Sequence, residues 1–169
     1  MTRPGPAHLS ARSKARKQAL DILFQADLMG IDPRQILREA LLDAEPPLRD
    51  YAVELVQGVL DRWHEVDERI SRSLDGEWTL DRLARVDRIL ARIATWEIIA
   101  ESVPVRVAIA EALVLAGELS TDESPAFLNG VLSGVARQQP LELDEVTTAH
   151  EQELSEAPAP ADPEAPAED

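Results

Sequence analysis

Basic side chains gather near the N-terminus of this chain in a pattern that suits binding to phosphates. The first twenty residues carry five basic side chains and no acidic one: Arg3, Arg12, Lys14, Arg16 and Lys17. On a helix, Arg12 and Arg16 share a face because they lie four residues apart, and Lys17 projects over the same side as Phe24, seven residues later. Arginine and lysine neutralise phosphates, while an aromatic ring can stack on an unpaired base for about 1 to 3 kcal/mol. The spacing therefore predicts a strip that binds single-stranded RNA.

Two other interpretations of these residues stay open. A basic run is also typical of a solvated helix start, which needs no ligand. Phe24 taken alone is as compatible with core packing as with base stacking.

The charge of the chain is divided among three segments. The net charge is -15, but residues 1–20 carry +5. Residues 21–140 carry 12 basic and 22 acidic side chains, and residues 141–169 carry 10 acidic and no basic ones. Such asymmetry indicates a basic nucleic-acid-binding arm on an acidic body with a separate acidic tail.

Both ends of the chain are predicted to lie outside the folded domain. Residues 1–9 are expected to be flexible, and apolar periodicity is lost from about residue 141. The Ala, Pro, Glu and Asp residues that follow cannot bury enough surface to offset chain entropy, so residues 141–169 are predicted to be a disordered, solvating tail. An alternative is that the negative charge of the tail competes with RNA for the basic N-terminus.

Residues 78–137 have the spacing of three helices. The first has apolar residues on two sides, which predicts a central position: Leu83, Val86, Ile89, Leu90, Ile93, Trp96 and Ala100. Pro104 ends it near Glu101 or Ser102 and begins the next helix. The buried face of that helix is predicted to contain Ala108, Ile109, Ala112, Leu115, Ala116 and Leu119.

The last helix is predicted to begin in the turn from Ser120 to Pro125. Ser120 and Glu123 have the spacing of a capping box, and Ser124 before Pro125 indicates a cap residue and a first helical position. The buried face of this helix is predicted to contain Phe127 or Leu128, with Val131, Leu132 and Val135.

The middle of the chain is also predicted to be helical. Asp32 before Pro33 indicates the start of a short helix that reaches about Asp43. One longer helix then follows, with a core stripe at Leu48, Ala52, Leu55, Val59, Trp63, Val66 and Ile70. Gly76 marks a boundary between helical halves at about 10–75 and 76–140. Because no segment alternates over the length of a strand, the fold class is predicted to be all-α, a compact helical bundle over residues 10–140.

Several function classes find no support in the sequence. The chain has no cysteine, which excludes disulfides and thiolate chemistry, and no apolar run of about 20 residues for a membrane span. His8, His64 and His150 lack the partners or spacing for catalysis or metal binding, and there is no phosphate-binding glycine loop. We therefore expect a cytoplasmic protein that is not an enzyme and needs no metal or cofactor.

Several groups of residues over about 10–138 together form a specific pattern: Ala11 to Phe24, Val86 to Arg88, Arg92 with Ile93, Trp96 with Glu97, Pro104, Val107 to Ile109, Glu111 with Ala112, and Phe127 to Leu132. In this pattern the chain resembles the NusB family of transcription antitermination factors. The resemblance implies about seven helices and binding of single-stranded boxA RNA together with NusE, the ribosomal small-subunit protein, in the RNA polymerase elongation complex with other Nus factors. The RNA-binding residues expected from it and from the basic strip are Arg12, Lys14, Arg16, Lys17, Phe24, Arg92, Glu123 and Phe127. For Arg92 a salt bridge with a nearby carboxylate, and for Phe127 a place in the core, are the competing interpretations.

Two positions depart from the family pattern, and two other functions remain open. Ala110 and Gly117 stand where the family usually has asparagine and lysine, so any contact that those residues make is absent here. One alternative function is a helical protein-interaction module or homodimer without RNA binding. The other is a fragment related to the N-terminal domain of an RNA cytosine methyltransferase. The chain is expected to be too short for such an enzyme. The sequence is compatible with a monomer and with a homodimer.

Overall fold

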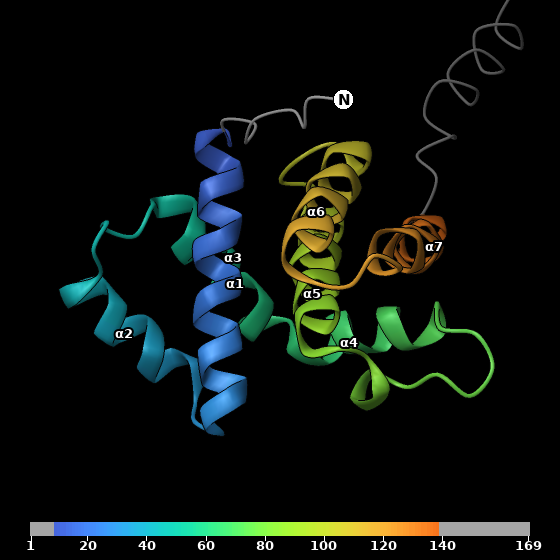
Figure 1. Ribbon diagram of the computed structural model, residues 1–169, viewed down its shortest axis with the longest axis horizontal. Helices are drawn as coiled ribbons and strands as arrows, with labels where there is room; N and C mark the ends of the chain where they lie inside the picture. Colours follow the sequence, from blue (N-terminus) through green and yellow to red (C-terminus); the bar gives the residue numbers. More distant parts are fainter. Residues whose placement is uncertain (1–8, 139–169) are drawn as a thin grey trace, which may run out of the picture. The chain divides into compact units, whose positions relative to one another are not determined.

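The computed structural model describes residues 9–138, which form seven α-helices, one short 3-10 helix and no strand (Figure 1). The helices are α1 (Ala11–Met29), α2 (Pro33–Asp43), α3 (Asp50–Asp61), α4 (Trp63–Arg72), the 3-10 helix η1 (Leu80–Arg82), α5 (Arg85–Ile99), α6 (Val105–Leu119) and α7 (Ser124–Arg137). The all-α prediction is confirmed, whereas the predictions for the first eight residues and for the tail at 141–169 lie outside the described residues. No helix among residues 9–138 is long and apolar enough to cross a membrane.

Local sequence signals fix both ends of α1. The hydroxyl of Ser10 accepts a hydrogen bond from the backbone N–H of Ser13 at 3.1 Å, which satisfies one of the free donors at the helix start. At the other end Gly30 has a φ of 67°, a left-handed conformation that glycine adopts without steric cost. The predicted start of α2 is confirmed as well, because the Asp32 carboxylate accepts from the N–H of Arg34 at 2.9 Å.

The single long helix predicted to extend from Leu48 to Ile70 is wrong. The structure has two helices in its place, separated at Arg62, whose φ of -115° and ψ of 24° leave the helical region. The apolar spacing continues across the break, so the buried stripe survives while the helix axis changes. A bend that inserts no residue leaves no gap in an apolar pattern.

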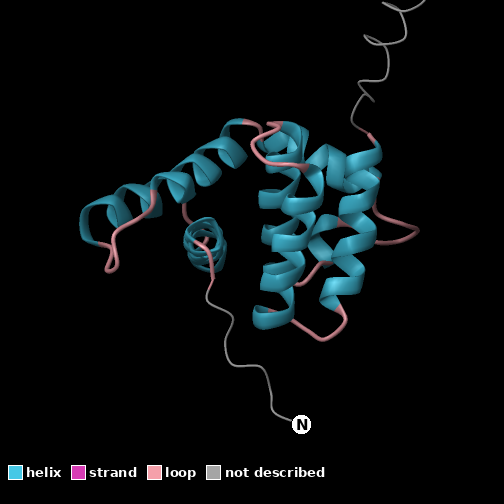
Figure 2. Cartoon of the chain, turned by 90° about the horizontal axis from the view of Figure 1, so that it is seen from above, coloured by secondary structure: helices cyan, strands magenta, loops and turns pink. Residues whose placement is uncertain are grey.

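Helix α5 lies at the centre of the bundle, as its two apolar stripes predict. Every residue from Ile89 to Ile99 is buried, and α5 packs against α1, α3, α4, α6 and α7 (Figures 1 and 2). Gly58 of α3 allows close packing, because a Cβ atom there would lie only 2.0 Å from Trp96 Cε2. After α5 the chain turns at Glu101, with a φ of 52°, and Pro104 is the cap residue of α6 rather than its first helical residue.

The turn between α6 and α7 differs from its predicted geometry. Ser124 does not cap α7 with its side chain, and Glu123 makes no side-chain cap bond either. Instead the buried Ser124 hydroxyl donates to Asp87 Oδ2 at 2.8 Å and accepts from the N–H of Thr121 at 3.2 Å, so it ties the turn to the start of α5. The predicted buried face of α7 is confirmed at Leu128, Val131, Leu132 and Val135, whereas Phe127 is only half-buried. On α6 the prediction fails at Leu119, which is 39% exposed at the helix end.

The division into two helical halves near Gly76 remains a prediction. The described residues belong to one compact unit, in which α4 from the N-terminal half packs against both α5 and α7.

Candidate nucleic-acid interface

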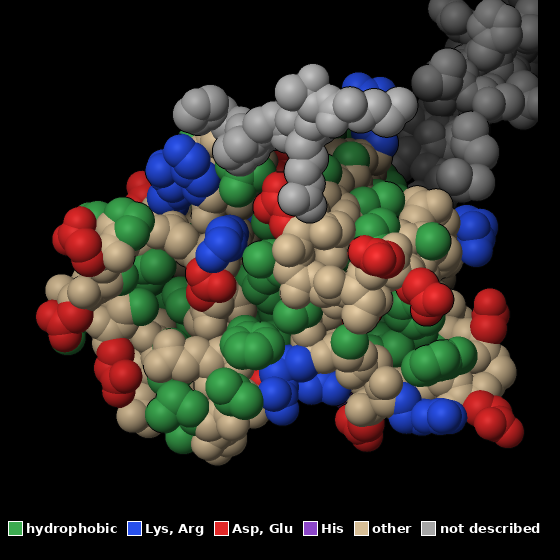
Figure 3. Space-filling model, viewed as in Figure 1, with side chains coloured by type: hydrophobic (Ala, Val, Ile, Leu, Met, Phe, Trp, Pro, Cys, Tyr) green, Lys and Arg blue, Asp and Glu red, His purple; other side chains and the backbone are tan. Residues whose placement is uncertain are grey.

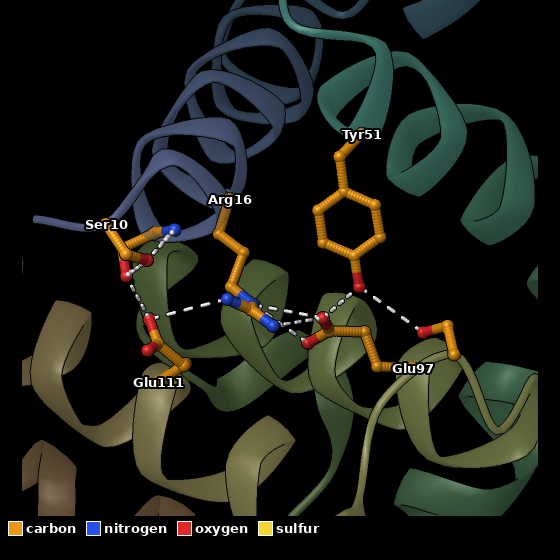
Figure 4. A network of polar contacts seen from close by, with 7 residues as sticks. Ser10, Arg16, Tyr51, Glu97 and Glu111 are labelled. Carbon is orange, nitrogen blue, oxygen red and sulfur yellow. Dashed lines mark hydrogen bonds and ion pairs between the residues drawn. The ribbon is translucent and has the colours of Figure 1, made fainter.

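A buried ion pair joins α1 to α5. Arg16 donates to Glu97 Oε1 from Nε at 3.0 Å and from Nη2 at 2.7 Å, and the two side chains are 3% and 1% exposed. The hydroxyl of Tyr51 from α3 donates to the same oxygen at 2.5 Å, and Glu111 from α6 lies 3.5 Å from Arg16 Nη1. Figure 4 shows these side chains converging from four helices. The prediction that Arg16 lies on an exposed strip with Arg12 is therefore wrong, because Arg16 points into the protein.

Burial and the neighbouring charges shift the pKa of Arg16 in opposite directions. Desolvation lowers its pKa, but the hydrogen bond and the charge of Glu97, followed by Tyr51 and Glu111, outweigh that effect and raise the pKa above its ordinary value. Burial, followed by the hydrogen bond to Glu97, raises the pKa of Tyr51 to about 12. The positive charge of Arg16 is thus balanced inside the protein and is not presented to a phosphate.

Three cations of the predicted strip stay on the surface of α1. The guanidinium carbon of Arg12 lies 4.6 Å from the centroid of the Tyr51 ring, and Lys14 is exposed without a carboxylate partner among residues 9–138. Lys17 pairs with Asp21 at 3.0 Å, but these side chains are 44% and 62% exposed. An exposed pair of this kind contributes at most about 1 kcal/mol, so a phosphate can replace the carboxylate.

Phe24 lies half-buried towards the other end of α1, beside Arg85 from α5. The Arg85 guanidinium is 5.8 Å from its ring centroid. Asp27 accepts hydrogen bonds from Arg85 Nε and from Arg88 Nη2, the second at 3.0 Å. Desolvation raises the pKa of Asp27, but the hydrogen bond from Arg85 and the charges of both arginines lower it overall. Phe24 therefore combines core contacts with a position next to cations that can meet a phosphate.

Arg92 is not on the open surface where an RNA contact was predicted. It donates to the two oxygens of Asp67 at 2.7 and 3.0 Å, and its side chain is 9% exposed. Its guanidinium also lies 4.0 Å from the centroid of the Trp63 ring. The competing interpretation, a salt bridge with a nearby carboxylate, describes this geometry, although the pair is more buried than a helix-surface pair.

A second aromatic site lies where η1 meets the start of α7. The rings of Trp78 and Phe127 are 5.8 Å apart at an angle of 53°, and the Arg82 guanidinium is 5.4 Å from the Trp78 ring. These three side chains line a cavity of about 210 Å³ whose edge includes the exposed Glu123. Because Trp78 is 50% exposed, this site offers an open aromatic surface beside a cation.

Basic and aromatic groups from distant parts of the sequence thus occur along the surface. In Figure 3 basic side chains lie over α1, near the junction of α1 with α5, and near η1, with hydrophobic side chains between them. Of the predicted RNA-binding residues, Arg12, Lys14, Lys17, Phe24, Glu123 and Phe127 are exposed or half-buried, whereas Arg16 and Arg92 are buried in ion pairs.

Five residues of this surface were not predicted from the sequence: Tyr51, Trp78, Arg82, Arg85 and Arg88. One signal was available, since Trp78 and Arg82 lie four residues apart, although here they belong to a loop and a 3-10 helix. No spacing rule connects Phe24 with Arg85, because 61 positions separate them and only the fold brings them together.

An all-helical domain with cations and aromatic rings along its surface has the features of a nucleic-acid-binding protein. Among residues 9–138, no group of three or more histidine, aspartate or glutamate side chains can hold a metal ion. Residues 13–137 match the sequence model of the NusB family, and the chain belongs to that family.

Relatives of known name and structure agree with this assignment. The transcription antitermination protein NusB of Kineococcus radiotolerans is 48% identical over 129 residues, which cover 76% of this chain and 94% of the relative. Among solved structures, NusB of T. maritima is 32% identical, with a TM-score of 0.68 over 77% of this chain and 93% of that one. A chain from the complex of antitermination factors NusB and NusE with double-stranded RNA is 26% identical, with a TM-score of 0.67 over 76% of this chain and 97% of that one.

Proposed function

We propose that this protein is a transcription antitermination factor that binds boxA-type single-stranded RNA together with NusE. It acts as a non-enzymatic scaffold in the cytoplasm, where it places the RNA and the ribosomal protein in the RNA polymerase elongation complex during ribosomal RNA synthesis. Family membership supports this proposal, as does the similarity to a structure that contains NusB, NusE and RNA.

The observation that carries the proposal is the pairing of aromatic rings with arginines at two surface sites. Phe24 lies beside Arg85, and Trp78 with Phe127 lies beside Arg82. Bases of a single strand stack on rings while guanidinium groups neutralise the phosphates between them. Arg12, Lys14 and Lys17 on α1 supply further phosphate contacts, and Glu123 at the edge of the cavity limits how closely the backbone approaches.

The NusB-fold body between residues 10 and 140 supplies the rigid support for this surface. We propose that Arg16 and Arg92 contribute to RNA binding by positioning α1 and α4 on α5, not by touching phosphates, because each is already paired with a buried or half-buried carboxylate. The acidic residues at 141–169 are proposed to form the separate solvating tail.

Binding of a boxA-containing RNA should be measured by fluorescence anisotropy over a salt series, with and without NusE. Phe127→Ala and Arg85→Gln are expected to weaken binding about tenfold each, and NusE is expected to tighten it. The matched control for Arg85 is Arg106→Gln, which removes an exposed arginine at the start of α6. If the intact chain binds no RNA even with NusE, the protein is a helical interaction module, and the RNA proposal is wrong.

A further inference from the structure

Three cations line a groove between α1 and α2, and two of them have no ion-pair partner in the part of the chain that the structure describes. Lys14 and Arg49 line it, and neither has an ion-pair partner among residues 9–138. Lys17 lies at the same groove, paired with the exposed Asp21. Three cations therefore stand against two carboxylates, Asp21 and Glu45, among the residues that line the groove.

The rim of this groove is fixed to α1 by one amide side chain. Gln18 donates from Nε2 to the carbonyl of Pro47 at 3.0 Å and accepts from the N–H of Arg49 at 3.0 Å. These two bonds hold the segment before α3 against the helix. The position of Arg49 at the groove is therefore set by the fold, although 32 residues separate it from Lys17.

The interior of the groove is apolar and large enough to hold a small planar group. Its volume is about 400 Å³, and Ile22, Ile36, Ala40 and Leu48 contribute to its lining. Glu45 also contributes to the lining. The groove is thus an apolar slot whose charged edge holds more cations than carboxylates. Pockets of a few hundred Å³ with an apolar lining and a few polar groups are typical of sites for small organic groups.

The groove continues the candidate interface along α1. Lys17 stands at the groove and lies seven residues before Phe24, which is about 10 Å along a helix axis on the same side. A strand stacked at Phe24 would therefore reach the groove within a few nucleotides. A phosphate backbone is complementary to Lys14, Lys17 and Arg49, and a base is complementary to the apolar interior.

We infer that this groove is a second binding site for the same single-stranded RNA. It takes up a base on its apolar interior while Lys14, Lys17 and Arg49 bind the flanking phosphates. This inference rests on the proposed function, and it adds a site and a residue, Arg49, that neither the family match nor the basic strip identifies.

Affinity as a function of RNA length tests the inference. RNAs of 6 to 16 nucleotides should gain affinity with length for the intact chain. Ala40→Phe, which fills the groove without changing charge, should remove at least half of the gain in log affinity. Arg49→Gln should lower the log-log salt slope for the long RNA by about 0.7, the value for one phosphate contact on a single strand. Arg38→Gln is the matched control, because Arg38 is an exposed arginine of α2 that lines a different surface.

Protection of a thiol from alkylation by bound RNA gives a second measurement, which does not rely on any loss of affinity in the groove variants. The natural chain has no cysteine, so Ala44→Cys at the groove and Ala110→Cys on the exposed side of α6 each carry a single thiol. The 16-nucleotide RNA should slow alkylation of the first thiol at least fivefold and leave the second unchanged.

The outcomes separate the two proposals. If the intact chain binds RNA and Phe127→Ala weakens it, but RNA length, Arg49→Gln and thiol protection show no effect at the groove, the second site is wrong and the proposed function stands. The same conclusion follows if Arg38→Gln matches Arg49→Gln, since the effect is then general electrostatics. Protection of Ala44→Cys by a decaglutamate peptide but not by RNA would assign the groove to an acidic protein segment and overturn the inference. If the intact chain binds no RNA, the proposed function itself fails.

Discussion

Replacing Arg16 with alanine should destabilise the fold far more than replacing Arg12, although both residues belong to one basic run. In the Arg16→Ala variant the Glu97 carboxylate, 1% exposed, keeps only the hydrogen bond from Tyr51 and loses the contacts at 2.7 to 3.2 Å from the guanidinium. Removing one partner of a buried pair typically costs about 3 to 5 kcal/mol, because the other charge stays buried without compensation. Arg12→Ala removes only an exposed contact with the Tyr51 ring, worth about 0.5 to 1 kcal/mol.

Urea unfolding followed by circular dichroism measures both changes in the free energy of unfolding. A double variant, Arg16→Ala with Glu97→Ala, should cost less than the sum of the single variants, because it removes the unpaired charge together with its partner. RNA affinity should show the opposite order. Arg12→Ala weakens binding and reduces the salt slope, whereas Arg16→Ala leaves the slope unchanged under conditions in which it is folded. A loss below about 1 kcal/mol for Arg16→Ala, or additive costs in the double variant, would refute the assignment of Arg16 to a buried structural ion pair.

Three further predictions follow from single contacts. Tyr51 is the only tyrosine in the chain, so its phenolate absorbance should titrate near pH 12 in the folded protein and near pH 10 in urea. Because folding raises the pKa of Tyr51, its contribution to the free energy of unfolding is present below pH 10 and is lost as the pH rises to about 12. Equal titration midpoints in the two states would contradict this prediction. Gly58→Ala should destabilise the protein by about 1 to 3 kcal/mol, because its Cβ would clash with the ring of Trp96. Gly130→Ala should stabilise it by up to about 1 kcal/mol, because Gly130 in α7 has open space around it. Changes of the same sign for both variants in thermal unfolding would refute the packing argument. Asp27→Asn should tighten RNA binding several-fold and steepen its salt dependence by freeing two arginines, and anisotropy that shows weaker binding would count against their proposed role.

Features that depend on a few neighbouring residues could be predicted from the sequence. The cap at Asp32 and the buried face of α7 at Leu128 to Val135 follow from helix termini and periodicity, and the structure confirms them. The central position of α5 followed from its two apolar stripes for the same reason.

The two wrong site placements have a common cause. Spacing showed that Arg12 and Arg16 lie near each other on α1, but a helical wheel does not show where the boundary between core and solvent falls. That boundary depends on Glu97, which is 81 residues from Arg16 along the chain and supplies the counter-charge that permits burial. Asp67 does the same for Arg92 from a distance of 25 residues. A basic residue whose partner is distant in sequence has the same local pattern as one that is free to bind phosphate.

The carboxylate of Asp27 gives the proposed RNA surface an internal competitor. Arg85 and Arg88 already bind this anion, so a phosphate that reaches them exchanges one negatively charged partner for another instead of filling an empty site. The displaced carboxylate stays close and repels the strand that replaced it. Because Asp27 orients the guanidinium groups before RNA binds, such contacts favour a phosphate in a defined position. They also limit the net binding free energy that each phosphate contributes. A surface of this kind would bind and release the RNA strand at modest affinity. A second protein that adds its own contacts to the strand would then set the lifetime of the complex.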